Sequence, residues 1–203
     1  MSKIWDFDET INYITINIDS IPYKVLNKKN NKQISYQNSY NAALLLHSIR
    51  QQINLISIYL RLNINNYTKN IQKCINCFLS IHPYNYLLSE MQDEKLLNIP
   101  FIGLNKPRNV KNKLLMEPIG RDKNLRAEYR DIFLNIRNYD NSLKRLQSLM
   151  SLVIHEITHT ACNHVTWKDD NHNNDFKSCE KIIKDAYNNM KKKYNNVYNK
   201  SWT

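Results

Sequence analysis

The chain can be interpreted outward from one stretch, His155-Glu156-Ile157-Thr158-His159. Residues four positions apart lie on the same face of an α-helix, one turn from each other. Two imidazoles arranged in this way can both reach one Zn²⁺ at about 2.0–2.1 Å. The residue after the first histidine points slightly away from that face, where a general base can take a proton from a water in the open position of the metal. The spacing therefore predicts a catalytic zinc site with Glu156 as the base.

The residues before this stretch have the spacing of a helix with one buried face. Apolar residues recur there at three- and four-residue steps: Leu143, Leu146, Met150, Val153, Ile154 and Ile157. Such a repeat matches the period of an amphipathic helix. Asp140, Asn141 or Ser142 can cap its N-terminus, and no Pro or Gly interrupts it before Cys162. We therefore expect the two histidines in the last turns of a largely buried helix.

A catalytic zinc site needs a third protein ligand and leaves the fourth position for water. Two histidines follow the motif, His164 and His172. His172 precedes Phe176 and an amphipathic segment, so it stands where a new helix begins and can fold back onto the first helix. His164 lies about 140° around the axis from His159 if the first helix continues that far. The residues favour His172 as the third ligand and keep His164 as the alternative.

With its third histidine, the motif resembles the WLM and SprT/Spartan group of zinc metalloproteases. The group is marked by His-Glu-x-x-His, a loop, and then His-x-x-x-Phe opening a helix, as found here at His172. The segment from Cys162 to His172 is especially similar to the WLM-type proteins of large DNA viruses. The resemblance covers roughly Leu87 to Tyr187. It implies that His172 is the third zinc ligand and that the substrates are proteins crosslinked to DNA or tightly bound on it.

Three features depart from the pattern of that family. Many members have Gly after the third histidine, where this chain has Asn173. The loop from His159 to His172 is longer than in the cellular WLM proteins. A tail for ubiquitin-like modifiers or segregase partners is not recognisable. These departures bear on the substrate and its recruitment more than on the metal site.

The composition limits the size of the fold and the kind of partner. A chain of 203 residues fits one domain, and we expect it to span 1–203, with the motif core at about 87–187. The net charge of +11 favours nucleic acid first and acidic membrane surfaces second, against the alternative of a basic protein without a polyanion ligand. The candidate phosphate-contacting residues are Arg108, Lys111, Lys113, Arg121, Lys191, Lys192 and Lys193.

The cysteines and the apolar segments bear on location. The N-terminus carries acids and no long apolar run, so we expect no signal peptide. No segment approaches the 18 consecutive apolar residues that suggest a membrane span. We therefore expect an intracellular, reducing compartment (cytoplasm, nucleus, or a virion or host cell) and free thiols at Cys74, Cys77, Cys162 and Cys179. Cys74-x-x-Cys77 has no second pair with zinc-site spacing and is interpreted as a structural pair on a helix.

The order of the expected elements predicts the fold class. The pattern indicates strands at Thr10–Ile18, Tyr23–Leu26, Tyr86–Gln92, Phe101–Asn105 and Asp131–Arg137, helices at Asn41–Leu62 and Tyr67–Leu79, a loop at Lys106–Arg121, and a last helix from Phe176. We expect an α+β, zincin-like domain: an antiparallel or mixed sheet packed on the motif helix, with additional N-terminal helices. Asp131–Arg137 is either the edge strand to which substrate adds by main-chain pairing or a buried central strand.

Together these features predict a zinc endopeptidase that holds one Zn²⁺ and acts on a protein substrate, with DNA as a further partner. Each ligating histidine needs an outer acceptor that fixes its tautomer, and Asp170 and Asp175 are the candidates. Tyr129, Arg130 and Tyr187 are candidates to stabilise the oxyanion.

Two other functions remain open at this point. One is a protease that processes viral or cellular proteins without DNA. The other is a non-catalytic, basic DNA-binding protein with a structural zinc, which a fourth ligand from Cys162, His164 or Asp170 would close.

Overall fold

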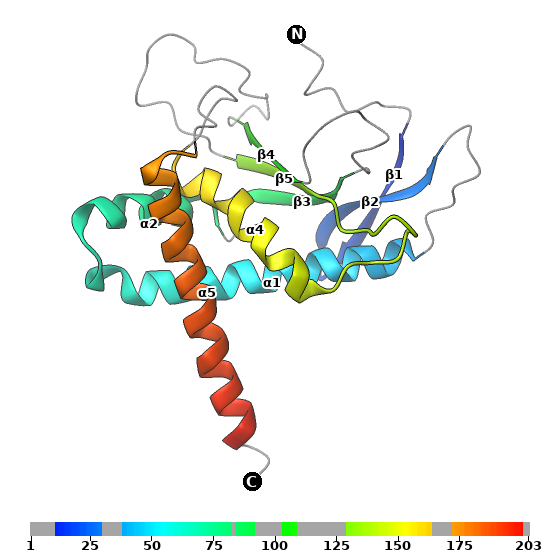
Figure 1. Cartoon of the computed structure of the whole chain (residues 1–203). Coiled ribbons are helices and arrows are strands. Elements are labelled where there is room, and N and C mark those ends of the chain that lie inside the picture. Colours follow the sequence, from blue (N-terminus) through cyan, green and yellow to red (C-terminus); the bar gives the residue numbers. More distant parts are fainter. Residues whose placement is uncertain are drawn as a thin grey trace, which may run out of the picture. The chain divides into compact units, whose positions relative to one another are not determined.

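The structure is a computed structural model that describes residues 11–29, 38–82, 84–91, 103–108, 129–163 and 172–200. Over these residues the fold is α+β, with a five-stranded mixed sheet and four α-helices (Figure 1). In chain order the elements are β1 (Ile11–Ile18), β2 (Ile21–Lys29), α1 (Ser39–Asn63), the 3₁₀ turn η1 (Ile64–Asn66), α2 (Lys69–Ile81), β3 (Tyr86–Glu90), β4 (Gly103–Arg108), β5 (Tyr129–Leu134), α4 (Leu146–Ala161) and α5 (Asn174–Lys200). The predicted fold class is confirmed at this level.

The chain divides into two compact units. Unit 1 comprises Met1–Ile49, Leu87–Leu104 and Asp131–Val153, and unit 2 comprises Arg50–Tyr86, Asn105–Arg130 and Ile154–Thr203. The expected single domain over 1–203 stays a prediction.

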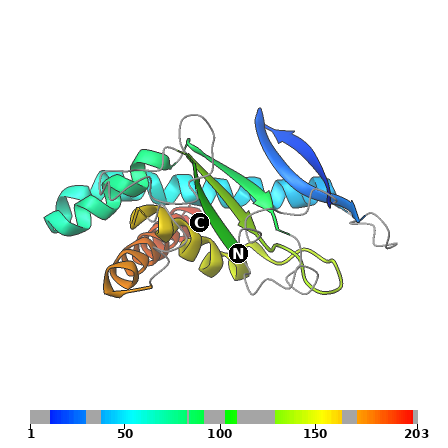
Figure 2. The same ribbon diagram turned by 90° about the horizontal axis from the view of Figure 1, so that it is seen from above.

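The β1–β2 hairpin belongs to unit 1 and confirms the predicted pair of strands (Figure 2). The two strands are antiparallel and pair Ile18 with Ile21 across a two-residue turn. Both turn residues, Asp19 and Ser20, have positive φ values of 50° and 63°. Two-residue hairpin loops favour this conformation because its twist matches that of the flanking strands. The turn therefore fixes which β2 residues face the core, and among these Val25 is fully buried.

A buried ion pair lies beside the hairpin in unit 1. Glu90, at the end of β3, is fully buried and receives hydrogen bonds from the Leu26 N–H at 2.9 Å and from the guanidinium of Arg137. Burial raises the pKa of Glu90, and the bonds from Arg137 and Leu26 oppose that rise. Arg137 also donates to the Asn141 carbonyl at 3.1 Å. One carboxylate thus joins β2, β3 and the segment after β5.

The sheet order is β1-β2-β3-β5-β4 (Figure 2). Of the two alternatives for Asp131–Arg137, the central strand is confirmed and the edge strand is wrong, because β5 lies between β3 and β4. Its nearly continuous burial is typical of a central strand covered on both faces. The outer strand on that side is β4. It begins at Gly103 and continues to Arg108, so the first residues of the predicted loop at Lys106–Arg121 are strand, and the rest lies outside the described residues.

The predicted helices are present with shifted ends. On α1, the buried residues recur at three- and four-residue steps: Ala42, Leu46 and Ile49 in unit 1, and Ile53, Ile56 and Leu60 in unit 2. The motif helix α4 begins at Leu146, later than predicted. The predicted cap residues form a turn instead, in which the backbone N–H and the hydroxyl of Ser142 donate to Asp140 at 2.9 and 2.6 Å. Short polar side chains often compete with helix formation in this way. Among the described residues, no helix is both long enough and apolar enough to cross a bilayer.

Candidate metal centre

The C-terminal half of α4 presents two imidazoles from one face. His155 and His159 are one turn apart, and their ring centroids are separated by 5.1 Å. The opposite side of this turn is buried, since Ile157 and Thr158 are fully inaccessible. His159 is 9 % exposed, whereas the His155 side chain is 35 % exposed. The apolar packing of α4 therefore fixes the helix and leaves one histidine open to solvent.

The third imidazole comes from the residues just before α5. The His172 ring centroid lies 4.8 Å from that of His155 and 5.4 Å from that of His159. One donor atom of each histidine can be chosen so that all three lie within 4.8 Å of one another. A tetrahedral zinc ion with ligand distances near 2.05 Å requires donor atoms about 3.3 Å apart. The nitrogens of each pair therefore need to move closer by at most about 1.5 Å to hold one ion. A set of three imidazoles also suits the ligand preference of zinc.

Phe176 supports all three imidazoles. Its ring centroid lies 5.2 Å from His155, 4.9 Å from His159 and 4.6 Å from His172, and the residue is 1 % exposed. Phe176 sits in the first turn of α5, which Asn173 caps: the Asn173 Oδ1 accepts the Phe176 N–H at 2.9 Å. Asparagine is among the preferred N-cap residues. Asn173 therefore has a structural role, because it caps the start of the helix that follows His172.

A carboxylate stands behind His155. The Glu180 Oε1 lies 3.3 Å from the His155 Nδ1. Histidine ligands commonly donate one ring N–H to a carboxylate, which leaves the other nitrogen for the metal. The sequence predicted Asp170 and Asp175 as the carboxylates beside the histidines. Asp170 lies outside the described residues, and Asp175 is exposed in the first turn of α5. The sequence offered a signal for Glu180, since it follows Phe176 by one helical turn.

Asn105 of the outer strand β4 anchors the motif helix within unit 2. Its Nδ2 donates to the Glu156 backbone carbonyl and lies 3.1 Å from the Thr160 Oγ1. Its Oδ1 accepts from Arg130 Nη1 at 3.3 Å. The Glu156 side chain on the same turn is 4 % exposed. Sequence reasoning missed Asn105, because a lone asparagine in a strand gives no sign of the helix it will contact.

The three residues predicted as candidates to stabilise the oxyanion differ in how deeply they are buried. Arg130 is 1 % exposed, and burial lowers the pKa of its guanidinium to about 9. Its guanidinium donates to the Asn105 Oδ1, and its role at the oxyanion stays a prediction. Tyr129 and Tyr187 are half-buried, and burial raises the pKa of Tyr187. The Tyr187 ring faces the Lys191 ammonium, which lies 5.5 Å from the ring centroid.

The structure leaves most of the predicted phosphate contacts untested. Lys192 and Lys193 are exposed on α5 and Lys191 is half-buried. The other phosphate-contact candidates lie outside the described residues: Lys111, Lys113, Arg121 and the side chain of Arg108. The alternative zinc ligand His164 lies outside them as well.

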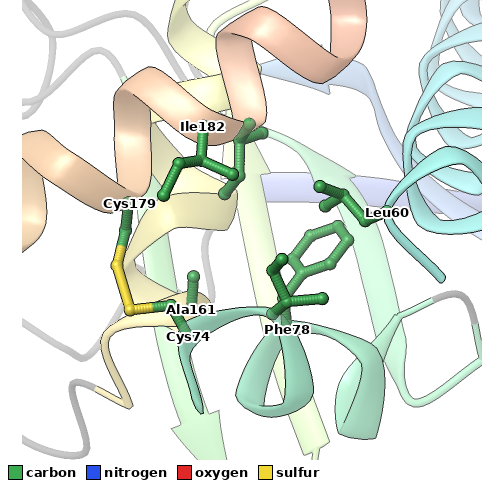
Figure 3. A pocket seen from close by; sticks show the side chains of 8 residues that line it. Leu60, Cys74, Phe78, Ala161, Cys179 and Ile182 are labelled. Carbon is green, nitrogen blue, oxygen red and sulfur yellow. A yellow bond between two sulfur atoms is a disulfide. The ribbon is translucent and has the colours of Figure 1, made fainter. Parts of the chain in front are cut away.

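The expectation of four free thiols is wrong. Cys74 of α2 and Cys179 of α5 form a disulfide, and their Cα atoms are 6.4 Å apart (Figure 3). Cys77 and Cys162 carry free thiols, and burial raises the pKa of Cys162 to about 12. The sequence could not show this pairing, because the two half-cystines are 105 residues apart and only the packing of α5 against α2 brings them together.

The chain matches no protein-family model, and no curated protein or solved structure is significantly similar to it. The resemblance to the WLM and SprT/Spartan group therefore stays a proposal, and the function has to be argued from the geometry of the three histidines.

Proposed function

We propose that this chain is a zinc-dependent endopeptidase of the His-Glu-x-x-His type, built as a zincin-like α+β protease. One observation carries the proposal: His172, which the motif does not contain, lies with His155 and His159 so that one donor atom of each falls within 4.8 Å of the others. A chance occurrence of the motif has no reason to be completed by a third imidazole from another element. The carboxylate of Glu180 behind His155 adds the outer partner that such ligands usually have.

The chain's own residues divide the chemistry between them. His155, His159 and His172 would hold the metal, and Glu180 would fix the orientation of the His155 ring. A bound zinc ion supplies Lewis-acid chemistry, which activates water and polarises the scissile carbonyl. Glu156 accepts the proton from the attacking water and delivers it to the leaving amine. The exposure of His172 leaves this side of the site accessible to a substrate.

The outer strand β4 is the proposed docking strand for the substrate. An extended peptide can add to an exposed sheet edge through main-chain hydrogen bonds. β4 is last in the sheet order, and its Asn105 contacts the turn of α4 that carries Glu156. Pairing with β4 would therefore run the peptide beside the motif helix.

The proposed substrates are proteins bound or crosslinked to DNA. The net charge of +11 and the exposed lysines of α5 support a polyanion partner, and the family resemblance supports this substrate class. Phosphate contacts release counterions, so affinity for duplex DNA should fall with salt at a log–log slope of about −0.9 per phosphate neutralised.

The test is proteolysis of a DNA-crosslinked protein and of casein, with and without DNA, over a salt series. We expect DNA to stimulate cleavage of the crosslinked substrate more than that of casein, with the stimulation lost at high salt. Glu156→Gln is the matched control, because it removes the base and retains all three histidines, so cleavage should stop while zinc stays bound. Equal rates with and without DNA would leave a processing protease. Zinc binding without any proteolysis would indicate a structural site.

A further inference from the structure

A second group of reactive side chains includes Cys179, which follows Phe176 of the histidine site by three residues on α5. The Cys74–Cys179 disulfide joins α2 to α5 within unit 2 (Figure 3). Apolar side chains surround it, among them Leu60, Phe78, Ala161 and Ile182, around a cavity of about 10 Å³. This volume barely admits one water, and apolar cavities stay dry, so the space is no ligand site. The sulfur atoms are instead the chemically active groups here.

The two sulfurs differ in access. Cys179 is 2 % exposed, whereas Cys74 is half-buried. Thiol–disulfide exchange depends on which sulfur can be reached. A reducing thiolate would therefore attack the Cys74 Sγ and expel the Cys179 sulfur.

The position of Cys179 on α5 connects the disulfide to the histidine site. Phe176, Cys179 and Ile183 are buried along one face of α5 at three- and four-residue steps. Phe176 contacts all three imidazoles, and Glu180, which follows Cys179 directly, contacts His155. The first two turns of α5 thus carry a packing ring and an orienting carboxylate, and His172 lies just before them. The disulfide ties this part of α5 to α2.

We propose that the Cys74–Cys179 disulfide is a redox-sensitive tether that sets the affinity of the histidine site for zinc. This inference rests on the proposed metal-binding function. A dithiol reductant supplies two electrons: one thiolate forms a mixed disulfide with Cys74, Cys179 leaves and takes a proton, and the second thiol then displaces Cys74. The S–S bond is reduced to two thiols, and the dithiol is oxidised to its own disulfide. The released α5 start holds His172 and Glu180 less firmly, so zinc binds more weakly.

Linkage makes the effect reciprocal. If reduction weakens zinc binding tenfold, bound zinc must favour the disulfide tenfold. For a two-electron couple this lowers the reduction potential by about 30 mV. The disulfide should therefore be harder to reduce in the zinc-loaded chain.

The experiment measures the zinc dissociation constant of the full chain by competition with a chromogenic chelator, in the oxidised state and after reduction with a phosphine. Peptide mass spectrometry establishes the state of each cysteine, and circular dichroism establishes that the reduced chain keeps its helices. We expect about tenfold weaker binding after reduction. A Cys74→Ser/Cys179→Ser variant should bind like the reduced chain and ignore the phosphine. The matched Cys77→Ser/Cys162→Ser variant keeps the disulfide and should respond like the wild type.

Four results would overturn the tether, and they separate it from the proposed function. Equal zinc affinity in both redox states would leave the metal site intact and remove the coupling. Absence of the Cys74–Cys179 disulfide from the oxidised chain would do the same. A second zinc equivalent in the reduced wild type, lost in Cys74→Ser/Cys179→Ser, would make these sulfurs metal ligands. No zinc in either state would contradict the histidine site itself and the tether with it.

Discussion

At the scale of single residues, Glu180 contacts His155, one of the three histidines of the candidate site. Glu180 lies on α5 and His155 lies on α4, so this pair also joins the two helices within unit 2. Both side chains are about one-third exposed, at 35 % and 36 %. An exposed ion pair adds little stability, so we propose that this contact serves to orient the imidazole.

Replacing Glu180 should weaken zinc binding without unfolding the chain. Glu180→Gln keeps the shape and loses the charge that holds the ring, and outer partners of this kind contribute about 10–100-fold in affinity. Lys181→Gln is the control, since Lys181 is an exposed neighbour on the same turn. Chelator competition measures both. The same zinc affinity in both variants would show that Glu180 does not contribute to the site.

His82 is a buried histidine outside the metal site. It is fully inaccessible between the rings of Phe78 and Tyr86, at centroid distances of 4.6 and 4.5 Å. Within the described part of the chain, neither ring nitrogen of His82 has a hydrogen-bond partner. Burial lowers the pKa of His82 well below 6.5, and the charges of Arg130 and Arg50 lower it further. The folded chain therefore holds this ring neutral.

The folded chain should lose stability in acid through His82. The unfolded chain takes up the His82 proton near pH 6.5, and the folded chain does so only at a lower pH, so the free energy of unfolding falls as the pH drops below about 6.5. The loss is at most about 1.4 kcal/mol per pH unit. Urea unfolding between pH 5 and 7.5, with excess chelator so that zinc release does not contribute, measures it. His82→Leu should show a shallower acid limb than His47→Gln. Parallel pH profiles for these two variants would contradict the assignment.

At the level of the elements, the local sequence predicted which segments are helices and strands better than it predicted which strands pair. The apolar repeats of α1 and α2 and the alternation of β1 follow from their own residues, and the structure confirms them. The position of β5 depends on β3 and β4, which are distant in sequence, so its own residues could not decide between edge and centre. The start of α4 was missed because Asp140 and Ser142 bond each other instead of capping a helix.

The Glu90–Arg137 pair offers a test of how β3 is joined to the segment after β5. Both side chains are buried, at 0 % and 6 % exposure. Removing one partner of such a pair leaves a buried charge and typically costs about 3–5 kcal/mol. Arg137→Met should therefore lower the free energy of unfolding by that amount in urea. The double variant Glu90→Leu/Arg137→Met should recover much of the loss, because no charge remains buried. A single variant as stable as the wild type would show that the pair does not join these segments.

For the whole molecule, the candidate site was more predictable than its surroundings. His155, His159 and His172 are recognisable because helix spacing and a helix start place them, and the structure brings them together. Asn105 and the Cys74–Cys179 bond come from segments far away in sequence, and no local pattern announces them. The net charge of +11 favours anionic partners, which bind exposed side chains. The periodicity of the sequence does not show which of the exposed basic residues would bind them.

The most direct measurement is the zinc content of the purified chain, determined by elemental analysis after loading and dialysis. We expect one zinc per chain. His172→Ala should lose it, with affinity lowered by more than the roughly 100-fold that outer partners contribute. The matched control His47→Ala removes a histidine of α1 and should keep the metal. No zinc uptake by the wild type, or full retention by His172→Ala, would contradict the site formed by His155, His159 and His172.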